Sequence, residues 1–331
     1  MMDELIDVIA FDIGGTQGRC GFARVPRTSA TGTGTVPPRN EFEFEALASF
    51  RRESSEQGPA WMERLIAGAK DLTSAKPRCA AISFGGPVSP DGRIQSVHVP
   101  GWENADLIGA VSRAFDLERG LVFVENDANA GALGECRFGA GRGCRDMLYF
   151  TVSTGIGGGV ILDGKLRRGA HGMAGEFGHI ILDGDPGAPQ YAAGKRGALE
   201  ALASGPAIER EGRAELARAG LGVPENLSAK IVFEAAAAGE AWAVETRRRC
   251  LSHLGRGIAA MVCAFDVERV VVGGGVSLAG DALFVPLRES VELFLPTFMR
   301  GKIQVLPAAL GDRAPIVGAV ASGLDKLNAM P

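Results

Sequence analysis

A short pattern of strand, glycine-rich turn and strand occurs twice in this sequence, about half a chain apart. The first copy joins the apolar residues 6–11 to the apolar residues 20–25, and the second joins residues 148–152 to residues 160–162. Continuous apolar runs of this length predict buried strands, and glycine between them predicts hairpins. The repetition predicts two lobes of similar fold, and a chance likeness between two hairpins is the alternative.

The rest of the sequence fits an α/β protein. A length of 331 residues favours two lobes, because one hydrophobic core rarely organises so many residues. Apolar runs predict further strands at residues 78–84, 121–124 and 269–272. Helical spacing of apolar residues predicts helices at residues 61–72, 105–115, 198–203, 208–219, 231–264 and 316–327.

Composition excludes several classes of protein. The formal charge is -4, and the one basic triplet, Arg247–Arg249, lies in a helical pattern that predicts a solvated face, so we expect no nucleic-acid partner. The six cysteines form no CxxC pair and predict reduced thiols. The acidic start runs straight into a strand, and no apolar run has the length of a bilayer crossing. We therefore expect a cytoplasmic protein without a membrane partner.

Both hairpin turns have the chemistry of a phosphate site. Glycine lets a phosphate chain approach the backbone N–H groups, and a hydroxyl adds a further donor. The residues concerned are Gly14, Gly15 and Thr16 in the first turn and Thr154 and Gly155 in the second. Asp12 precedes the first turn and is a candidate to hold Mg²⁺ through water. An ordinary tight hairpin is the alternative for each turn taken alone.

Three further segments carry candidate site residues. Gly274 and Gly275 end a predicted strand, where an adenosine could lie, although a plain strand-to-helix turn explains them equally well. Asp127 follows a predicted strand and opens a helix, so it is either a helix N-cap or a catalytic base beside Asn126. Glu176, His179 and Glu200 could bond sugar hydroxyls, while ordinary hydrogen bonding is the alternative for the Glu–His pair.

Together and in this order, these motifs resemble those of the ROK family (repressors, open reading frames and kinases). The resemblance runs from Phe11 to about Leu324. It rests on residues 12–16, 125–130, 132–135, 154–159, 174–179 and 273–277 and on the pair Gly318–Ala319.

The resemblance implies an actin-like, ribonuclease-H-like α/β ATPase fold with two lobes around a cleft. We expect a small lobe of residues 1–124 plus about 313–331 and a large lobe of residues 125–312. The family likeness implies ATP and Mg²⁺ between the lobes and favours a homodimer. It assigns Asp127 as the base and implies that the sugar is bound by Gly86, Asn126, Asp127, Glu176, His179 and Glu200.

One departure from the family pattern concerns zinc. Members that bear zinc carry three cysteines before the residue that matches Glu200, and the histidine that matches His179 completes the site. The matching positions here are Tyr191, Ala193 and Ala198. A structural zinc site needs four ligands, mostly thiolates. We therefore expect no zinc, and we expect other partners to orient His179.

The resemblance predicts an ATP-dependent hexose kinase that transfers the γ-phosphate to the 6-hydroxyl of glucose. N-acetylmannosamine, N-acetylglucosamine and fructose are the alternative sugars, and polyphosphate is the alternative donor. A sugar-sensing transcription regulator is the alternative from another class, but the first phosphate turn begins at residue 12, which leaves no room for a helix-turn-helix domain before it. An inactive sugar-binding protein is disfavoured by the presence of Asp12 and Asp127.

Overall fold

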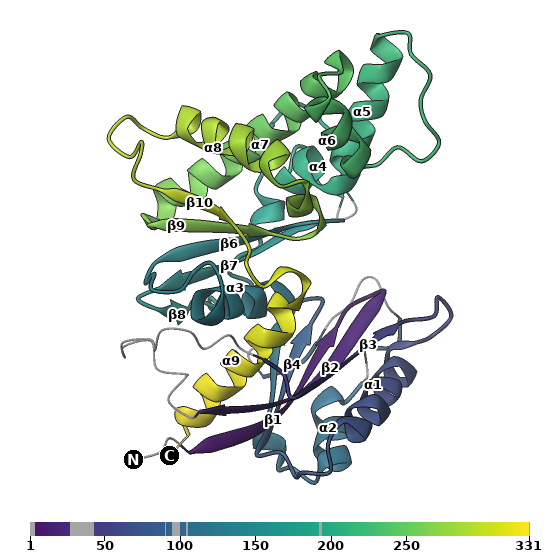
Figure 1. Ribbon diagram of the computed structural model, residues 1–331, viewed down its shortest axis with the longest axis vertical. Helices are drawn as coiled ribbons and strands as arrows, with labels where there is room; N and C mark the ends of the chain where they lie inside the picture. The colour runs from purple at the N-terminus through teal and green to yellow at the C-terminus, as the bar shows by residue number, and fades with distance from the viewer. Residues whose placement is uncertain are drawn as a thin grey trace. The chain divides into compact units, whose positions relative to one another are not determined.

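The computed structural model describes residues 4–26, 43–89, 91–94, 100–103, 105–191 and 194–330. Contacts divide the chain into two compact units (Figure 1). Unit 1 takes residues 1–143, 159–174 and 313–331, and unit 2 takes residues 144–158 and 175–312. Unit 1 and the expected small lobe share the closing segment from residue 313. The lobe boundary expected at residues 124 and 125 stays a prediction.

The first sheet has five strands in the order β3-β2-β1-β4-β5. These strands are β1 (Leu5–Ile13), β2 (Gln17–Pro26), β3 (Ala46–Arg51), β4 (Cys79–Phe84) and β5 (Val122–Asn126). Strands β1, β2 and β3 form an antiparallel meander, whereas β4 and β5 run parallel to β1. The carboxyl ends of β1, β4 and β5 therefore meet at one edge of the sheet.

Helices cover both faces of this sheet. On one face, α1 (Gly58–Leu72) and α2 (Leu107–Phe115) pack on a core that contains Phe11, Ile82 and Trp61. Side chains alternate along a strand, so Ala81 points away from Ile82. Gly323 lies against Ala81, which places α9 (Ala314–Asn328) on the opposite face. Helix α9 also packs closely on α3 (Asp127–Phe138), as Figure 1 shows.

The second sheet repeats the strand order of the first, since it reads β10-β9-β6-β7-β8. Its strands are β6 (Met147–Val152), β7 (Ile156–Leu162), β8 (Lys165–Leu166), β9 (Arg269–Gly273) and β10 (Gln304–Pro307). With the strands of each sheet numbered in chain order, the first sheet is 3-2-1-4-5, and the second sheet, read from β8 to β10, is also 3-2-1-4-5. The predicted repetition is therefore confirmed, and chance likeness is wrong. The second turn is shorter than predicted, because β7 already begins at Ile156 and includes three of the glycines.

Unit 2 carries most of the helices. They are α4 (Leu199–Ala203), α5 (Gly205–Arg218), α6 (Ala229–Ala237), α7 (Ala241–Phe265) and α8 (Asp281–Phe294). The helical stretch predicted at residues 231–264 is two helices, because Gly239 between them has φ +87°. Arg248 and Arg249 each lie 2.7 Å from Glu245, which agrees with the predicted solvated face of α7. Within the described ranges, no helix combines the length and the apolar character needed to cross a membrane.

Candidate active site

Asp12 lies near the carboxyl end of β1 in a buried network. Its side-chain Oδ2 accepts a hydrogen bond from Arg19 Nη1 at 3.1 Å, and its Oδ1 accepts one from Ser83 Oγ at 3.0 Å. Asp12 and Arg19 are each only 8% exposed. A carboxylate has about four acceptor positions. Direct coordination of a magnesium ion by Asp12 would compete with Arg19, so a contact through a water of the ion stays the prediction.

The first glycine turn is held through its carbonyl groups. Gly14 O accepts from the Trp61 indole at 3.2 Å, Gly15 O accepts from Arg52 Nε at 2.6 Å, and Thr16 O accepts from the Arg52 backbone N–H at 2.9 Å. The peptide bonds of the described residues are all trans. In a trans peptide the N–H points opposite to the preceding carbonyl. The N–H groups of Gly15 and Thr16 therefore point away from Trp61 and Arg52, as an anion site requires.

Asn126, and not Asp127, is the N-cap of α3. Its side-chain Oδ1 accepts from the N–H groups of Ala128 and Asn129, each at 3.0 Å. Asp127 is the first helical residue. The Asn126 amide donates to Asp127 Oδ1 at 3.0 Å and to Gly86 O at 3.1 Å. The N-cap alternative for Asp127 is thus wrong, and its carboxylate is held by the capping residue beside it.

Gly85 links the turn to the Asp127 carboxylate. Its N–H donates to Ile13 O at 2.9 Å. A Cβ at this position would lie 3.3 Å from Ile13 O, 3.6 Å from Gly14 Cα and 3.7 Å from Asp127 Oδ2. A Cβ here would therefore be tight against Ile13 O and in ordinary contact with Gly14 and Asp127. Unit 1 therefore brings together the predicted residues Asp12, Gly14, Gly86, Asn126 and Asp127.

A buried carboxylate anchors the strand that presents Asp127. Glu125 is 4% exposed and accepts from Arg168 Nε at 2.7 Å and from Ser322 Oγ at 3.2 Å. Lys326 donates to Val124 O at 2.9 Å, and burial lowers the pKa of its ammonium group. A buried charge without partners would be costly, so these contacts fix the end of β5 to α9.

Unit 2 assembles the second turn and the Glu200 side chain. Glu200 Oε2 accepts from the Ile156 N–H at 2.8 Å. A Cβ on Gly155 would lie 2.6 Å from the same oxygen, and a Cβ on Gly178 would lie 2.2 Å from Ile156 O. Glycine is needed at both positions for close packing inside the protein. The phosphate role of Thr154 and Gly155 therefore stays a prediction.

The Glu176–His179 pair also belongs to unit 2 and contacts Tyr191. His179 Nε2 is 3.4 Å from Glu176 Oε2, and His179 Nδ1 is hydrogen-bonded to the Tyr191 hydroxyl. Burial raises the pKa of Tyr191, and the charges of Glu200 and Glu176 raise it further. Both carboxylates therefore lie near the phenol. Unit 2 brings Gly155, Glu176, His179 and Glu200 into one cluster.

Gly274 turns the chain after β9. Its φ is +86°, and a Cβ there would lie 2.4 Å from Val152 O. Ser277 Oγ donates to Gly274 O at 2.7 Å, which closes the turn into the short helix Gly275–Ala279. The turn alone accounts for glycine at this position, so the adenosine role of Gly274 and Gly275 also stays a prediction.

The segment that replaces the zinc loop is held by its backbone. Leu182 N–H donates to Gly197 O at 2.8 Å, and Gly197 N–H donates to Pro189 O at 2.9 Å. Gly197 has φ +67°, and a Cβ there would lie 1.8 Å from Asp183 O. Tyr191 and Ala198 lie in the described chain, whereas Ala193 lies outside the described residues. In the described ranges, no three His, Cys, Asp or Glu side chains gather as a metal-binding group.

Sequence reasoning missed the residues that support these motifs. Arg19 lies opposite Asp12 in the β1–β2 register, so the predicted hairpin already contained the signal for this pair. Arg52, Trp61 and Tyr191 carried no such signal. Their contacts depend on how distant segments pack, which a single sequence does not show.

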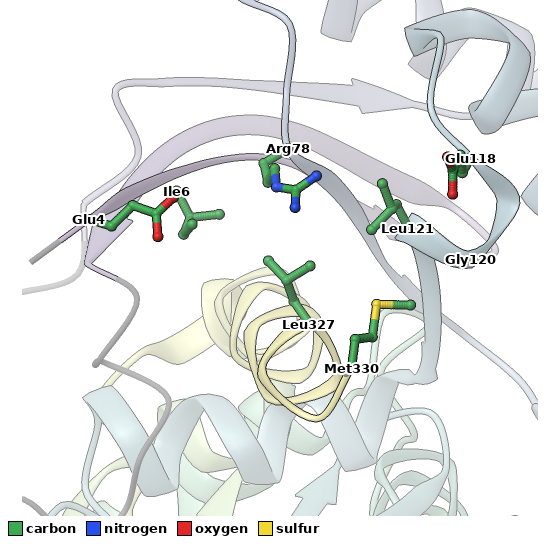
Figure 2. Close-up of a pocket in the computed structure, with 8 residues that line it drawn as sticks. All are labelled: Glu4, Ile6, Arg78, Glu118, Gly120, Leu121, Leu327 and Met330. Carbon is green, nitrogen blue, oxygen red and sulfur yellow. The ribbon is translucent and has the colours of Figure 1, made fainter.

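A cavity of about 280 Å³ lies away from these motifs (Figure 2). It is lined by Glu4, Ile6, Arg78, Glu118, Gly120, Leu121, Leu327 and Met330. The amino-terminal ends of β1, β4 and β5 and the end of α9 surround it. Because these strands are parallel, the cavity lies at the edge of the sheet opposite Asp12 and Asp127. It therefore plays no part in the candidate site.

Comparisons with known proteins agree with the motifs. Residues 40–325 match the model of the ROK family. A glucokinase of Thermotoga maritima is 40% identical over 232 residues, which cover 68% of this chain and 71% of that protein. A glucokinase of Halalkalibacterium halodurans is 40% identical over 204 residues, which cover 60% of this chain and 62% of that protein.

Solved structures extend the likeness to nearly the whole chain. The crystal structure of a ROK family glucokinase from Streptomyces griseus, in complex with glucose and AMPPNP, superposes with a TM-score of 0.74 at 31% identity. The superposition covers 95% of this chain and 97% of that one. The expected actin-like α/β fold is confirmed by this match and by the strand order of the sheets. This chain belongs to the ROK family.

Proposed function

We propose that the protein is an ATP-dependent hexose kinase that transfers the γ-phosphate of ATP to the 6-hydroxyl of glucose. The observation that carries the proposal is the Asp127 carboxylate, which Asn126 holds at the end of β5 and which lies beside Gly85, next to Gly14 of the first glycine turn. A base beside a phosphate turn is the arrangement that phosphoryl transfer to an alcohol needs. Relatives named glucokinase point to glucose as the acceptor.

Asp127 acts as the general base in this proposal. Its carboxylate accepts the proton of the 6-hydroxyl as that oxygen attacks the γ-phosphorus. The new O–P bond forms while the bond from the γ-phosphorus to the β–γ bridging oxygen breaks, and ADP leaves with the bond's electron pair. General-base help supplies roughly 10²- to 10⁴-fold, and positioning supplies about 7–11 kcal/mol. Rate therefore depends on how rigidly Asn126 and Gly86 hold the base.

The phosphates are bound by the backbone N–H groups of Gly15 and Thr16, next to Gly14, whose own N–H closes the turn onto Gln17 O at 3.0 Å. Thr154 and Gly155 add donors from the second turn. Arg52 and Trp61 support this role in unit 1, because they fix the carbonyls of the turn on the opposite side. Bound Mg²⁺ would neutralise phosphate charge, with Asp12 holding one of its waters. Arg19 keeps the Asp12 carboxylate in place for that contact. Gly274 and Gly275 would face the adenosine.

Unit 2 offers groups for the sugar hydroxyls. Glu200 Oε2 accepts from Ile156 N–H, and the second oxygen, Oε1, would accept from a sugar hydroxyl. Glu176 and His179 are half-exposed and present a carboxylate oxygen and an imidazole nitrogen. Sugar hydroxyls both donate and accept, so a mixed set of this kind suits them.

We also propose that the protein is a cytoplasmic homodimer and that it binds no zinc. Stoichiometric zinc in the purified protein would contradict the absence of zinc.

A coupled assay of ADP release over a panel of hexoses tests the proposed function. Glucose should give the highest kcat/KM, ahead of N-acetylmannosamine, N-acetylglucosamine and fructose. Polyphosphate in place of ATP serves as the donor control, with sugar phosphate measured directly. Sugar binding without phosphoryl transfer from any donor would show an inactive binding protein and contradict the proposal.

A further inference from the structure

The side chain of Tyr191 lies against an imidazole that the proposed function assigns to the sugar. The phenol and imidazole ring centroids are 5.3 Å apart with an interplanar angle of 36°, and the hydroxyl is bonded to His179 Nδ1. The opposite ring nitrogen, Nε2, is 3.4 Å from Glu176 Oε2. Protein groups therefore contact both nitrogens of His179, one on each edge of the ring.

The loop around Tyr191 holds the phenol in place. Tyr191 N–H donates to Lys195 O at 3.3 Å, and Tyr191 O accepts from Gly194 N–H at 2.9 Å. Gln190 forms an antiparallel bridge with Arg196, and its side chain donates to Gly194 O at 3.1 Å. Backbone bonds on both sides thus fix the residue that bears the hydroxyl. A phenol on a mobile chain could not select one orientation of its partner.

The direction of this hydrogen bond decides where the imidazole proton lies. A phenol can donate or accept, whereas a neutral imidazole has one donor and one acceptor nitrogen. The Glu176 carboxylate only accepts, and its Oε2 lies 3.4 Å from Nε2, so the ring proton lies on Nε2. Nδ1 is then the acceptor nitrogen, and the Tyr191 hydroxyl, whose pKa is raised by burial and by the nearby carboxylates, donates to it. Nε2–H points toward Glu176, where a sugar hydroxyl oxygen can accept it.

We infer that Tyr191 is a positioning residue: its hydroxyl donates to His179 Nδ1 and thereby presents Nε2–H to a sugar hydroxyl beside Glu176. This inference rests on the proposed function for the identity of the ligand. Without the phenol hydroxyl the ring can rotate or change tautomer, and the donor to the sugar is lost in part of the population. Asp127 and the phosphate turn are untouched, so sugar binding should suffer more than turnover.

The test compares Tyr191→Phe with Lys195→Ala. The first removes the hydroxyl and keeps the ring, whereas the second removes an exposed side chain of the same loop and keeps its backbone bond and the phenol. Tyr191→Phe should raise the KM for glucose about 2- to 10-fold, the worth of one hydrogen bond, with kcat changed less than twofold. Lys195→Ala should leave both constants near the wild-type values. An equal rise of KM in both variants, or no rise in Tyr191→Phe, would overturn the inference.

Imidazole ¹⁵N spectra of the unliganded protein give a second readout that needs no activity. The His179 signals are assigned by their loss in His179→Gln. The wild type should show the Nε2–H tautomer, and Tyr191→Phe should show a tautomer mixture. An Nδ1–H tautomer in the wild type would refute the hydrogen bond as assigned. A wild type that fails the hexose assay but shows the Nε2–H tautomer would refute the proposed function alone.

Discussion

Two side chains outside the glycine motif set the peptide planes of the first glycine turn, the proposed phosphate site. Trp61 comes from α1, and Arg52 lies just after β3, yet both donate to carbonyls of the turn. The motif supplies a backbone without Cβ atoms, and these two residues decide which way its N–H groups point. Glycine alone would leave the turn free to adopt other conformations. Preorganised donors avoid a reorganisation cost when phosphate binds.

Arg52→Ala should weaken ATP binding. The variant loses the charged donor to Gly15 O and to the carbonyls of Glu53 and Glu56. We expect about a tenfold rise in the KM for ATP, which corresponds to about 1.4 kcal/mol, with little change in the KM for glucose. Arg51→Ala is the matched control, because the Arg51 side chain is exposed on the neighbouring position. An equal rise in the KM for ATP in both variants would contradict this role of Arg52.

At the scale of elements, helix α9 crosses α3 at glycine. A Cβ on Gly318 would lie 1.6 Å from Ala130 O, and a Cβ on Gly134 would lie 2.6 Å from Ala314 O. Ala130 and Gly134 belong to the helix that begins with Asp127. The close approach therefore helps to fix the helix that carries the proposed base. Gly318–Ala319 was recognised in the sequence only as a match to the family.

Gly318→Ala should destabilise the protein. Alanine favours a helix over glycine by up to about 1 kcal/mol. However, the added Cβ would lie 1.6 Å from the backbone oxygen of Ala130, so the two helix backbones would have to move apart. Overpacking of this kind costs about 1–3 kcal/mol, and we expect the free energy of unfolding to fall by at least that much. Denaturant unfolding measures the change. Gly222→Ala, where an added Cβ meets nothing within 4 Å, should have little effect.

The start of α2 gives a prediction for pH. The Asp106 side chain accepts two hydrogen bonds from Arg119, at 2.7 and 2.8 Å, and caps the helix through Gly109 N–H. These contacts, the Arg119 bond first, lower the pKa of Asp106 to about 2. An unfolded aspartate has a pKa of about 3.9. The stabilisation is therefore present above about pH 4 and is lost as the pH falls toward about 2.

Asp106→Asn isolates this charge, because asparagine caps helices as well as aspartate does. The side chain is 50% exposed, so the wild type should be more stable than the variant by only about 0.5–1 kcal/mol at pH 6. That difference should shrink toward zero at pH 2. Urea unfolding at both pH values measures it. A difference that is independent of pH would show that Arg119 does not lower the pKa of Asp106.

Across the whole molecule, the sequence was sufficient to predict the two hairpins and most of the strands paired with them. The buried strands β1, β4, β6 and β9 are continuous apolar runs, so their positions could be predicted. Strands β3, β8 and β10 and helix α8 were missed. Strand β8 has two residues, β10 has four, and α8 contains Pro286, which opposes a helix prediction.

In the candidate site, the sequence identified the residues of the motifs but not the residues that support them. Asp12, Asn126, Asp127, Glu176, His179 and Glu200 were found because each lies in a short motif. The supporting residues were not found, because folding of the chain brings them to the motifs: Arg52 and Trp61 at the first turn, Arg168 and Ser322 at Glu125, and Tyr191 at His179. Asn126 took the capping role that the sequence allowed for Asp127, since its side chain reaches two N–H groups while its amide holds the carboxylate.

The central claim is that this ROK family member transfers phosphate with Asp127 as its base, and Asp127→Asn tests it most directly. The amide oxygen of the substituted side chain can still accept from Ala128 N–H and from Asn126, so the start of α3 should keep its structure. We predict that calorimetry will show glucose affinity within a few-fold of the wild type while kcat falls by about 10²- to 10⁴-fold. A variant that binds glucose and retains near-normal kcat would contradict the account.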